Sequence, residues 1–252
     1  MSFGSQSQKS HALSKTQLHY QTGHIAMEPS SYTPIPLPDF KEIEDNASQA
    51  ASKQFLEVMK SRHSVRHYAE RPVARIIIEN AIETAGRAPS GANQQPWHFV
   101  AIQDQEMKLR IRTAAEAEEK AFYAGGGGDE WIQALEPLGT TAHKPHLTDA
   151  PWLIVVFAQR YGLTPDNQRY KHYYVPESVG IATGILITAL HQAGLASLVH
   201  TPNPMRFLNQ MCQRPAHEKP VMILPVGYPA ENATIPQAST RKKPLDRIMS
   251  CF

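Results

Sequence analysis

The sequence predicts one α+β domain, and three observations carry that prediction. Residues 152–158 form a continuous apolar run, which suits a strand buried on both faces of a sheet. Residues 178–193 are apolar almost all round, which indicates a helix buried in a core or at a subunit interface. The chain has 252 residues, of which 41% are hydrophobic, enough for a single domain with a sizeable core.

The remaining elements follow from hydrophobic spacing and from the residues that break it. Residues 88–96 contain two prolines and a glycine and are expected to form a loop. Four consecutive glycines at 125–128 are expected to form no stable element, because glycine loses the most backbone entropy on ordering, so a mobile hinge or lid is predicted there. Further elements are expected at helices 48–60, 73–87 and 106–123 and at strands 98–102, 195–200 and 221–226.

The N-terminal segment differs in composition from the rest of the chain. Residues 1–45 are rich in Ser, Gln, His and Pro and lack a helical period, which predicts an extended or disordered arm. Residues 46–252 are then the folded domain, with no internal repeat and no second domain. The N-terminus lacks the apolar stretch of a secretory signal.

Charge and cysteine usage exclude several classes of function. The formal net charge is +2, and acidic and basic residues are mixed, so no nucleic-acid or membrane surface is expected. No apolar run approaches the roughly 18 to 20 residues that span a bilayer. The two cysteines make no disulfide framework, and a reducing, cytoplasmic setting is the simplest interpretation. The 12 histidines have no metal-type spacing, so no metal site is expected.

A short basic segment is the first candidate binding site. Arg62, His63, Ser64, Val65 and Arg66 combine two guanidinium groups with a hydroxyl, and guanidinium binds phosphate bidentately. Taken alone, the segment fits a solvated basic turn better than a phosphate site, because short basic clusters usually face solvent.

The loop before the first strand is the second candidate. It contains Pro89, Ser90, Gly91, Ala92 and Asn93, so a ligand could approach the backbone closely and receive hydrogen bonds suited to a planar heterocycle. A purely structural loop explains these residues equally well.

The two motifs together, RHSVRHYAERPV followed by APSGANQQPWHFVAI, resemble the N-terminal half of the FMN-dependent nitroreductase family. The basic run 241–245 resembles the family's closing motif. The resemblance implies a three-layer sandwich with a central mixed sheet, an intertwined homodimer, and FMN bound at the subunit interface. The FMN-binding residues that it implies are Arg62, His63, Ser64, Val65, Arg66, Pro89, Ser90, Gly91, Asn93, Val199, His200, Thr201, Arg241 and Lys242.

Three segments, HYYVPESVGIATGILITALHQAGL, RPAHEKPVMILPVGYP and RKKPLDRIM, resemble the iodotyrosine deiodinase subfamily within that family. The resemblance implies a lid at about 113–148, in which Glu119, Tyr123 and Lys144 clamp the amino-acid end of a halotyrosine. It further implies that the backbone N–H of Ala92 binds the substrate phenolate. Thr201 is the implied catalytic residue, bonded to the flavin N5 so that electrons pass one at a time.

The predicted function is therefore FMN-dependent reductive dehalogenation of halotyrosine. A general NAD(P)H-dependent nitroreductase or quinone reductase is the alternative, favoured by Asn93, Gln94 and Gln95 and by the glycine-rich lid. A non-catalytic flavin-binding or tyrosine-binding protein is a third. No glycine-rich dinucleotide fingerprint follows a strand, so NAD(P)H binds elsewhere or a separate reductase supplies the electrons.

Overall fold

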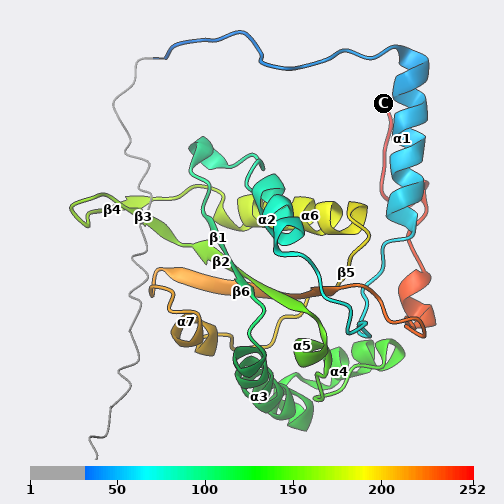
Figure 1. Cartoon of the computed structure of the whole chain (residues 1–252), viewed down its shortest axis with the longest axis vertical. Helices are drawn as coiled ribbons and strands as arrows, with labels where there is room; N and C mark the ends of the chain where they lie inside the picture. Colours follow the sequence, from blue (N-terminus) through cyan, green and yellow to red (C-terminus); the bar gives the residue numbers. More distant parts are fainter. Residues whose placement is uncertain (1–31) are drawn as a thin grey trace, which may run out of the picture.

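The computed structural model describes residues 32–252, and its middle layer is a four-stranded sheet (Figure 1). Neighbouring strands run antiparallel, and a parallel bridge between Ser64 and Ser197 makes the sheet mixed. Helices cover both faces, so the predicted α+β three-layer sandwich is confirmed. The strand order is β1 (Trp97–Ile102), β2 (Trp152–Gln159), β6 (Glu218–Gly227) and β5 (Ala196–Ser197).

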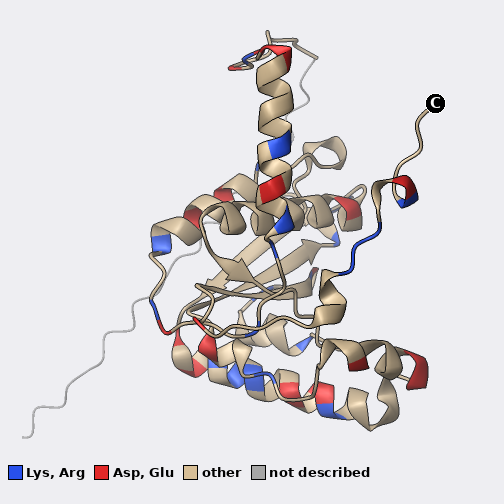
Figure 2. Ribbon diagram, turned by 90° about the vertical axis from the view of Figure 1, so that its right-hand side faces the viewer, with Lys and Arg blue, Asp and Glu red and all other residues tan. Residues whose placement is uncertain are grey.

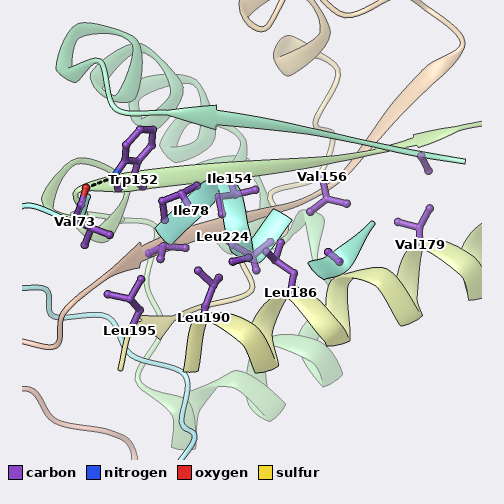
Figure 3. Close-up of a cluster of buried hydrophobic side chains, with 14 residues drawn as sticks. Val73, Ile78, Trp152, Ile154, Val156, Val179, Leu186, Leu190, Leu195 and Leu224 are labelled. Atoms are coloured by element: carbon purple, nitrogen blue, oxygen red, sulfur yellow. Dashed lines mark hydrogen bonds between the residues drawn. The ribbon is translucent and has the colours of Figure 1, made fainter. Parts of the chain in front are cut away.

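Strand β2 divides the core into two halves, because successive side chains of a strand point to opposite faces. Ile154 and Val156 pack toward α2 (Arg75–Ala85) and α6 (Val175–Gln192), as Figure 3 shows. The alternate residues of β2 pack into a second core with residues of α3 (Gln105–Ala121), α5 (His146–Asp149) and α7 (Phe207–Met211). The predicted double burial of this strand is confirmed, since Leu153 through Phe157 have no exposed surface.

The segment between α3 and α5, which is the central part of the lid predicted at about 113–148, lies beneath the sheet in Figure 1. It consists of a π-helical turn (Phe122–Gly126), α4 (Asp129–Leu135) and the 3-10 turn η3 (Glu136–Leu138). The prediction that the four glycines form no element was wrong for the first two. The N–H of Gly127 donates to Phe122 O at 3.0 Å and closes the π turn, and the φ of +116° at Gly125 suits glycine.

The predicted strand 195–200 was too long. Ala196 and Ser197 pair with β6, but the next position faces Pro225, which has no N–H to donate. Leu198 donates to the Pro225 oxygen at 3.3 Å, and only at His200 do mutual backbone bonds with Ile223 resume. A proline in the neighbouring strand thus interrupts the ladder.

Helix α1 (Asp45–Lys60) stands apart from the three layers in Figures 1 and 2 and has no buried residue. Its last turn is tied to α6, where His191 Nε2 lies 2.9 Å from Val58 O. Most of the predicted arm, residues 1–31, lies outside the described residues, and 32–44 contain no helix or strand.

Several short elements had no sequence-based prediction. The chain reverses in a hairpin that projects from the sheet, and the C-terminal segment makes two 3-10 turns. The unpredicted elements include η1 (Gly91–Asn93), β3 (Tyr161–Leu163), β4 (Arg169–Lys171), η4 (Gln237–Thr240) and η5 (Leu245–Arg247).

No helix within residues 32–252 has the length and apolar character needed to cross a membrane.

Candidate active site

A cavity of about 230 Å³ lies between the lid and the segment that follows β5. It brings together predicted residues from four parts of the chain, namely Arg66, Glu119 with Tyr123, Lys144, and Val199 with His200 and Thr201. Apolar lid residues complete the lining, which comprises Arg66, Glu118, Glu119, Phe122, Tyr123, Trp131, Leu135, Leu138, Thr140, Lys144, His146, Leu198, Val199, His200, Thr201 and Asn203.

Three predicted clamp residues surround one end of this cavity. Glu119 Oε2 and Lys144 Nζ are 3.0 Å apart, and their side chains are only 13% and 8% exposed. The ammonium of Lys144 lies 5.7 Å from the centre of the Tyr123 ring, and the Tyr123 hydroxyl is 2.7 Å from Thr140 Oγ1. Because the pair is largely shielded from water, its charges act on a ligand with little screening.

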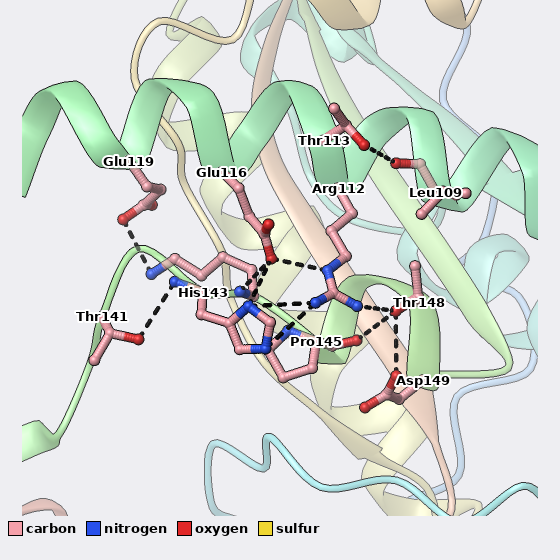
Figure 4. Close-up of polar contacts among 11 residues, drawn as sticks. Leu109, Arg112, Thr113, Glu116, Glu119, Thr141, His143, Pro145, Thr148 and Asp149 are labelled. Carbon is pink, nitrogen blue, oxygen red and sulfur yellow. Dashed lines mark hydrogen bonds and ion pairs between the residues drawn. The ribbon is translucent and has the colours of Figure 1, made fainter.

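The lid begins and ends in a charged network at its base (Figure 4). Glu116 Oε1 accepts a bond from the Lys144 backbone N–H at 2.7 Å and from Arg112 Nε at 2.8 Å. Arg112 Nη1 also donates to Thr148 Oγ1 at 2.8 Å. Burial opposes ionisation of Glu116, but these hydrogen bonds outweigh it and lower the pKa of its carboxyl group.

The cavity floor presents a cation and two imidazole rings. Within residues 32–252 the Arg66 guanidinium has no ion pair, and burial lowers its pKa, although arginine stays charged at neutral pH. His146 and His200 are 4% and 6% exposed, their ring centres are 5.3 Å apart, and the Nε2 atom of each lacks a partner among the described residues. Burial, followed by repulsion from nearby charges, lowers the pKa of both histidines to about 3.

The predicted phosphate-binding segment divides between two cavities. Arg66 reaches the cavity of the clamp, whereas Arg62, His63 and Val65 line a separate cavity of about 350 Å³ beside β5. Ser64 joins the edge of the sheet through a parallel bridge to Ser197, in which the N–H of Val65 donates to Ser197 O at 3.2 Å. The chain therefore presents its basic residues on two sides of one extended segment.

The predicted ring-binding loop lies far from the cavity of its own chain. Pro89, Ser90, Gly91, Ala92 and Asn93 are absent from the cavity lining. In Figure 1 their loop lies at the top beside α2, while the lid lies at the bottom of the molecule.

The conformation of that loop is strained. Ala92, Asn93 and Gln95 all have φ near +50°, a region that such residues rarely occupy. Ser90 Oγ accepts the Gln95 N–H at 2.9 Å, and the Gln94 side chain bonds the backbone of Lys171 and Tyr173, both at 2.8 Å. These bonds hold the loop in its strained form.

The predicted closing motif lies on an exposed C-terminal segment. Arg241 follows η4, and Lys242 Nζ donates to Ser239 O at 2.7 Å. Figure 2 shows this basic stretch on the segment that leads to the C-terminus. Neither residue lines the cavity of the clamp.

Sequence reasoning missed four residues that build the site. Arg112 and Glu116 lie one helical turn apart on the helix that carries Glu119, and that spacing was the available signal. Thr140 and His146 gave none, because only the folded lid brings them beside Tyr123 and His200. No group of three or more potential metal ligands occurs within 32–252.

The Nitroreductase family model matches residues 59–228. The chain belongs to the nitroreductase family. Among curated relatives of this nitroreductase, an iodotyrosine deiodinase from Haliscomenobacter hydrossis is 46% identical over 202 residues, covering 80% of this chain and 91% of the relative. Iodotyrosine deiodinase 1 from Homo sapiens is 43% identical over 199 residues, covering 79% and 68%.

Solved structures agree with this placement of the nitroreductase chain. A crystal structure of oxidised iodotyrosine deiodinase bound to FMN and 3-iodo-L-tyrosine matches with a TM-score of 0.61 and 32% identity, covering 70% of this chain and 90% of that one. A BluB-like flavoprotein from Clostridium difficile has a TM-score of 0.59 at 20% identity, covering 78% and 98%, which supports the fold alone.

The residues around the cavity fit the flavin that such proteins bind. Arg66 offers a half-buried positive charge to an anionic group, and guanidinium suits phosphate oxygens. The unpaired Nε2 atoms of His146 and His200 need hydrogen-bond partners, which a heterocycle or its ordered water can supply. The donor set therefore matches FMN in charge and hydrogen-bonding character.

Proposed function

We propose that this member of the nitroreductase family is an FMN-dependent enzyme that reductively removes halogen from halogenated tyrosine. The Glu119–Lys144 pair carries the proposal, because two opposite, nearly buried charges 3.0 Å apart face the cavity that Thr201 also lines. An amino-acid zwitterion offers the complementary charges, an ammonium for Glu119 and a carboxylate for Lys144. Each would then form a charge-assisted hydrogen bond with substrate.

In the proposed reaction the carbon–halogen bond breaks, two electrons and one proton place hydrogen on that carbon, and halide leaves. Bound FMN, in its reduced form, supplies the electrons. The chain's own residues orient the substrate and exclude water. Tyr123 covers the ring end, while Phe122 and Trp131 shield the cavity from the lid side, with ring centres 5.0 Å apart.

The proposal assigns the FMN residues as the resemblance implies. Arg62, Ser64, Arg66 and Arg241 hold the phosphate and ribityl end, and Thr201 contacts the reactive edge of the ring. The flavin domain spans residues 46–252, with residues 113–148 as its lid. Ala92 offers its backbone N–H to the substrate phenolate, which stabilises the negative charge on that oxygen.

A homodimer is part of the proposal, because each chain holds its ring-binding loop away from its own cavity. Helix α6 also leaves an apolar stripe on its outer side, where Ile181 is 46% exposed and Ile185 is half-buried. A groove of about 620 Å³ between α1, α2 and α6 exposes Phe55 beside it. We propose that a second copy covers this face and that its loop reaches the partner's cavity, and light scattering should then report twice the chain mass.

We further propose a cytoplasmic location, supported by the free thiols of Cys212 and Cys251. The electron donor is NAD(P)H or a separate reductase. Flavin reduction by NADH, by NADPH and by a purified reductase system, each measured at 450 nm without oxygen, distinguishes these donors.

The test is halide release from 3-iodotyrosine by the purified yellow protein, without oxygen and with dithionite as reductant. Iodide and tyrosine should appear in equal amounts. Glu119→Gln should raise the KM for iodotyrosine by roughly a hundredfold with FMN content unchanged, because a buried charge partner is lost. Glu106→Gln, an exposed site on the same helix, is the control. Reduced flavin without iodide release would contradict the proposal.

A general NAD(P)H-dependent nitroreductase or quinone reductase is the second candidate. Asn93, Gln94 and Gln95 favour it, because they resemble the corresponding loop of such enzymes, and glycine in the lid raises the entropic cost of closing over a small substrate. Rapid reduction of nitroaromatics by NADPH, together with no response to iodotyrosine, would favour this candidate.

A further inference from the structure

We infer that Glu116 is a positioning residue that fixes the backbone at Lys144, so that the Lys144 ammonium stands opposite Glu119 at the substrate site. This inference rests on the proposed function and deepens it. Glu116 has no place in the cavity lining, so it acts through Lys144 and not on the substrate.

The contacts of Glu116 converge on one oxygen atom. Oε1 accepts the Lys144 backbone N–H at 2.7 Å and Arg112 Nε at 2.8 Å, and His143 Nδ1 lies 3.4 Å away. Hydrogen bonds to an ionised carboxylate are about twice as strong as neutral ones. Figure 4 shows Glu116 and Glu119 descending from α3 to meet the returning end of the lid.

The backbone of Lys144 is held on both of its polar groups. Its N–H bonds Glu116, and its C=O accepts the Leu147 N–H at 3.1 Å, which begins α5. Arg112 Nη1, on α3, donates to Thr148 Oγ1 of α5 at 2.8 Å and so ties the two helices together. With its backbone fixed in this way, the Lys144 side chain leaves the chain in one direction, toward Glu119.

The two carboxylates of α3 therefore bind different groups of Lys144. Glu119 meets the ammonium of Lys144, and Glu116 meets its backbone, one turn earlier on the same helix. The lid residues 122–143 lie between the two tied ends and include five glycines. Without the Glu116 bond, ordering Lys144 would draw on the entropy of this whole segment.

An ordinary surface ion pair elsewhere in the chain provides a matched comparison. Arg75 Nε and Glu79 Oε1 have the same order and spacing on α2, at 2.6 Å. Their side chains are 79% and 49% exposed, against 20% and 19% for Arg112 and Glu116, and within residues 32–252 Glu79 accepts no hydrogen bond from the backbone of another element. Exposed pairs of this kind contribute little, so Glu79 is the control site.

The experiment uses the FMN-loaded enzyme with Glu116→Ala, Glu116→Gln and Glu79→Ala. Glu116→Ala should raise the KM for iodotyrosine by about tenfold to a hundredfold, because a bond to a charged acceptor is lost. It should leave FMN content and the rate of flavin reduction by dithionite unchanged. Glu116→Gln keeps an acceptor for the Lys144 N–H and should recover most of the loss, whereas Glu79→Ala should match wild type.

Amide hydrogen exchange over residues 140–148 gives a readout that does not depend on activity. Exchange should accelerate in Glu116→Ala at this segment alone and return toward wild type in Glu116→Gln. If the wild type releases no iodide, the proposed function fails while exchange still tests the bond. If the wild type is active and Glu116→Ala changes neither KM nor exchange, the positioning role of Glu116 is wrong.

Discussion

The base and the tip of the lid are built on opposite principles. At the base, Glu116, Glu119 and Lys144 are mostly buried and joined by short charge-assisted bonds. At the tip, Gly125 and Gly128 have positive φ, and Trp131, which is 56% exposed, makes an edge contact with Phe122. The base therefore sets geometry, and the tip can adapt its shape at low cost.

This difference separates two demands on a substrate lid. Recognition of a zwitterion needs fixed charges, since a charge misplaced by an ångström loses much of its effect. Closing over rings of different size needs a segment that becomes ordered only when the substrate is bound. In the proposed function, the clamp at the base and the glycines at the tip meet both demands within one segment.

Removing the charge at the base should have the largest effect. Lys144→Met leaves Glu119 buried without its partner, so the KM for iodotyrosine should rise by roughly a hundredfold or more. FMN content should stay at the wild-type level. Steady-state iodide release at a range of substrate concentrations measures the change, and a KM within threefold of wild type would contradict the clamp.

Lowering the pH should reduce the free energy of unfolding, because His146 and His200 are buried as neutral rings in the cavity floor. His146 and His200 ordinarily titrate near 6.5, but their pKa in the fold is about 3. Between these values the unfolded chain binds protons that the native chain does not, so stability is full above pH 6.5 and falls toward pH 3. The limiting slope is about 1.4 kcal/mol per pH unit for each histidine.

Urea unfolding at pH 7, 6 and 5 measures that slope. His146→Phe removes one of the two titrating groups, so the variant should lose less stability than wild type as the pH falls. Equal slopes in the two proteins would show that His146 does not stay neutral in the fold.

A change at the tip should have a smaller effect. Gly125→Ala places a side chain at φ +116°, which costs about 1 to 3 kcal/mol in an L residue. Nothing lies within 4 Å of the added Cβ, so the penalty is conformational and stays local. The KM should rise by about tenfold, and the midpoint of thermal unfolding should shift little. A KM effect as large as that of Lys144→Met would remove the distinction between base and tip.

The sequence predicted the layers of the fold better than the details of the site. The apolar run at 152–158 and the apolar helix of α6 located both cores. The roles of Glu119, Tyr123 and Lys144 stay a prediction, although the fold does gather them around one cavity. Spacing alone could not place them, because the resemblance supplied that grouping.

What sequence reasoning missed depends on contacts between distant segments. The bond from the Lys144 backbone to Glu116 crosses 28 residues, and no local pattern encodes it. The early end of β5 depends on Pro225 in another strand. The π turn at Phe122–Gly126 formed where glycine entropy predicted no structure, because one backbone bond from Gly127 closes it.

The distance between the strained loop and the cavity of its own chain has a genetic consequence. In the proposed dimer each catalytic centre is a composite of two polypeptides. One chain supplies the clamp, and the other supplies the ring-binding loop. A chain damaged in the loop and a chain damaged at Lys144 would each be inactive alone. Combined in one mixed dimer, they would restore a single working centre, because one composite receives both undamaged halves.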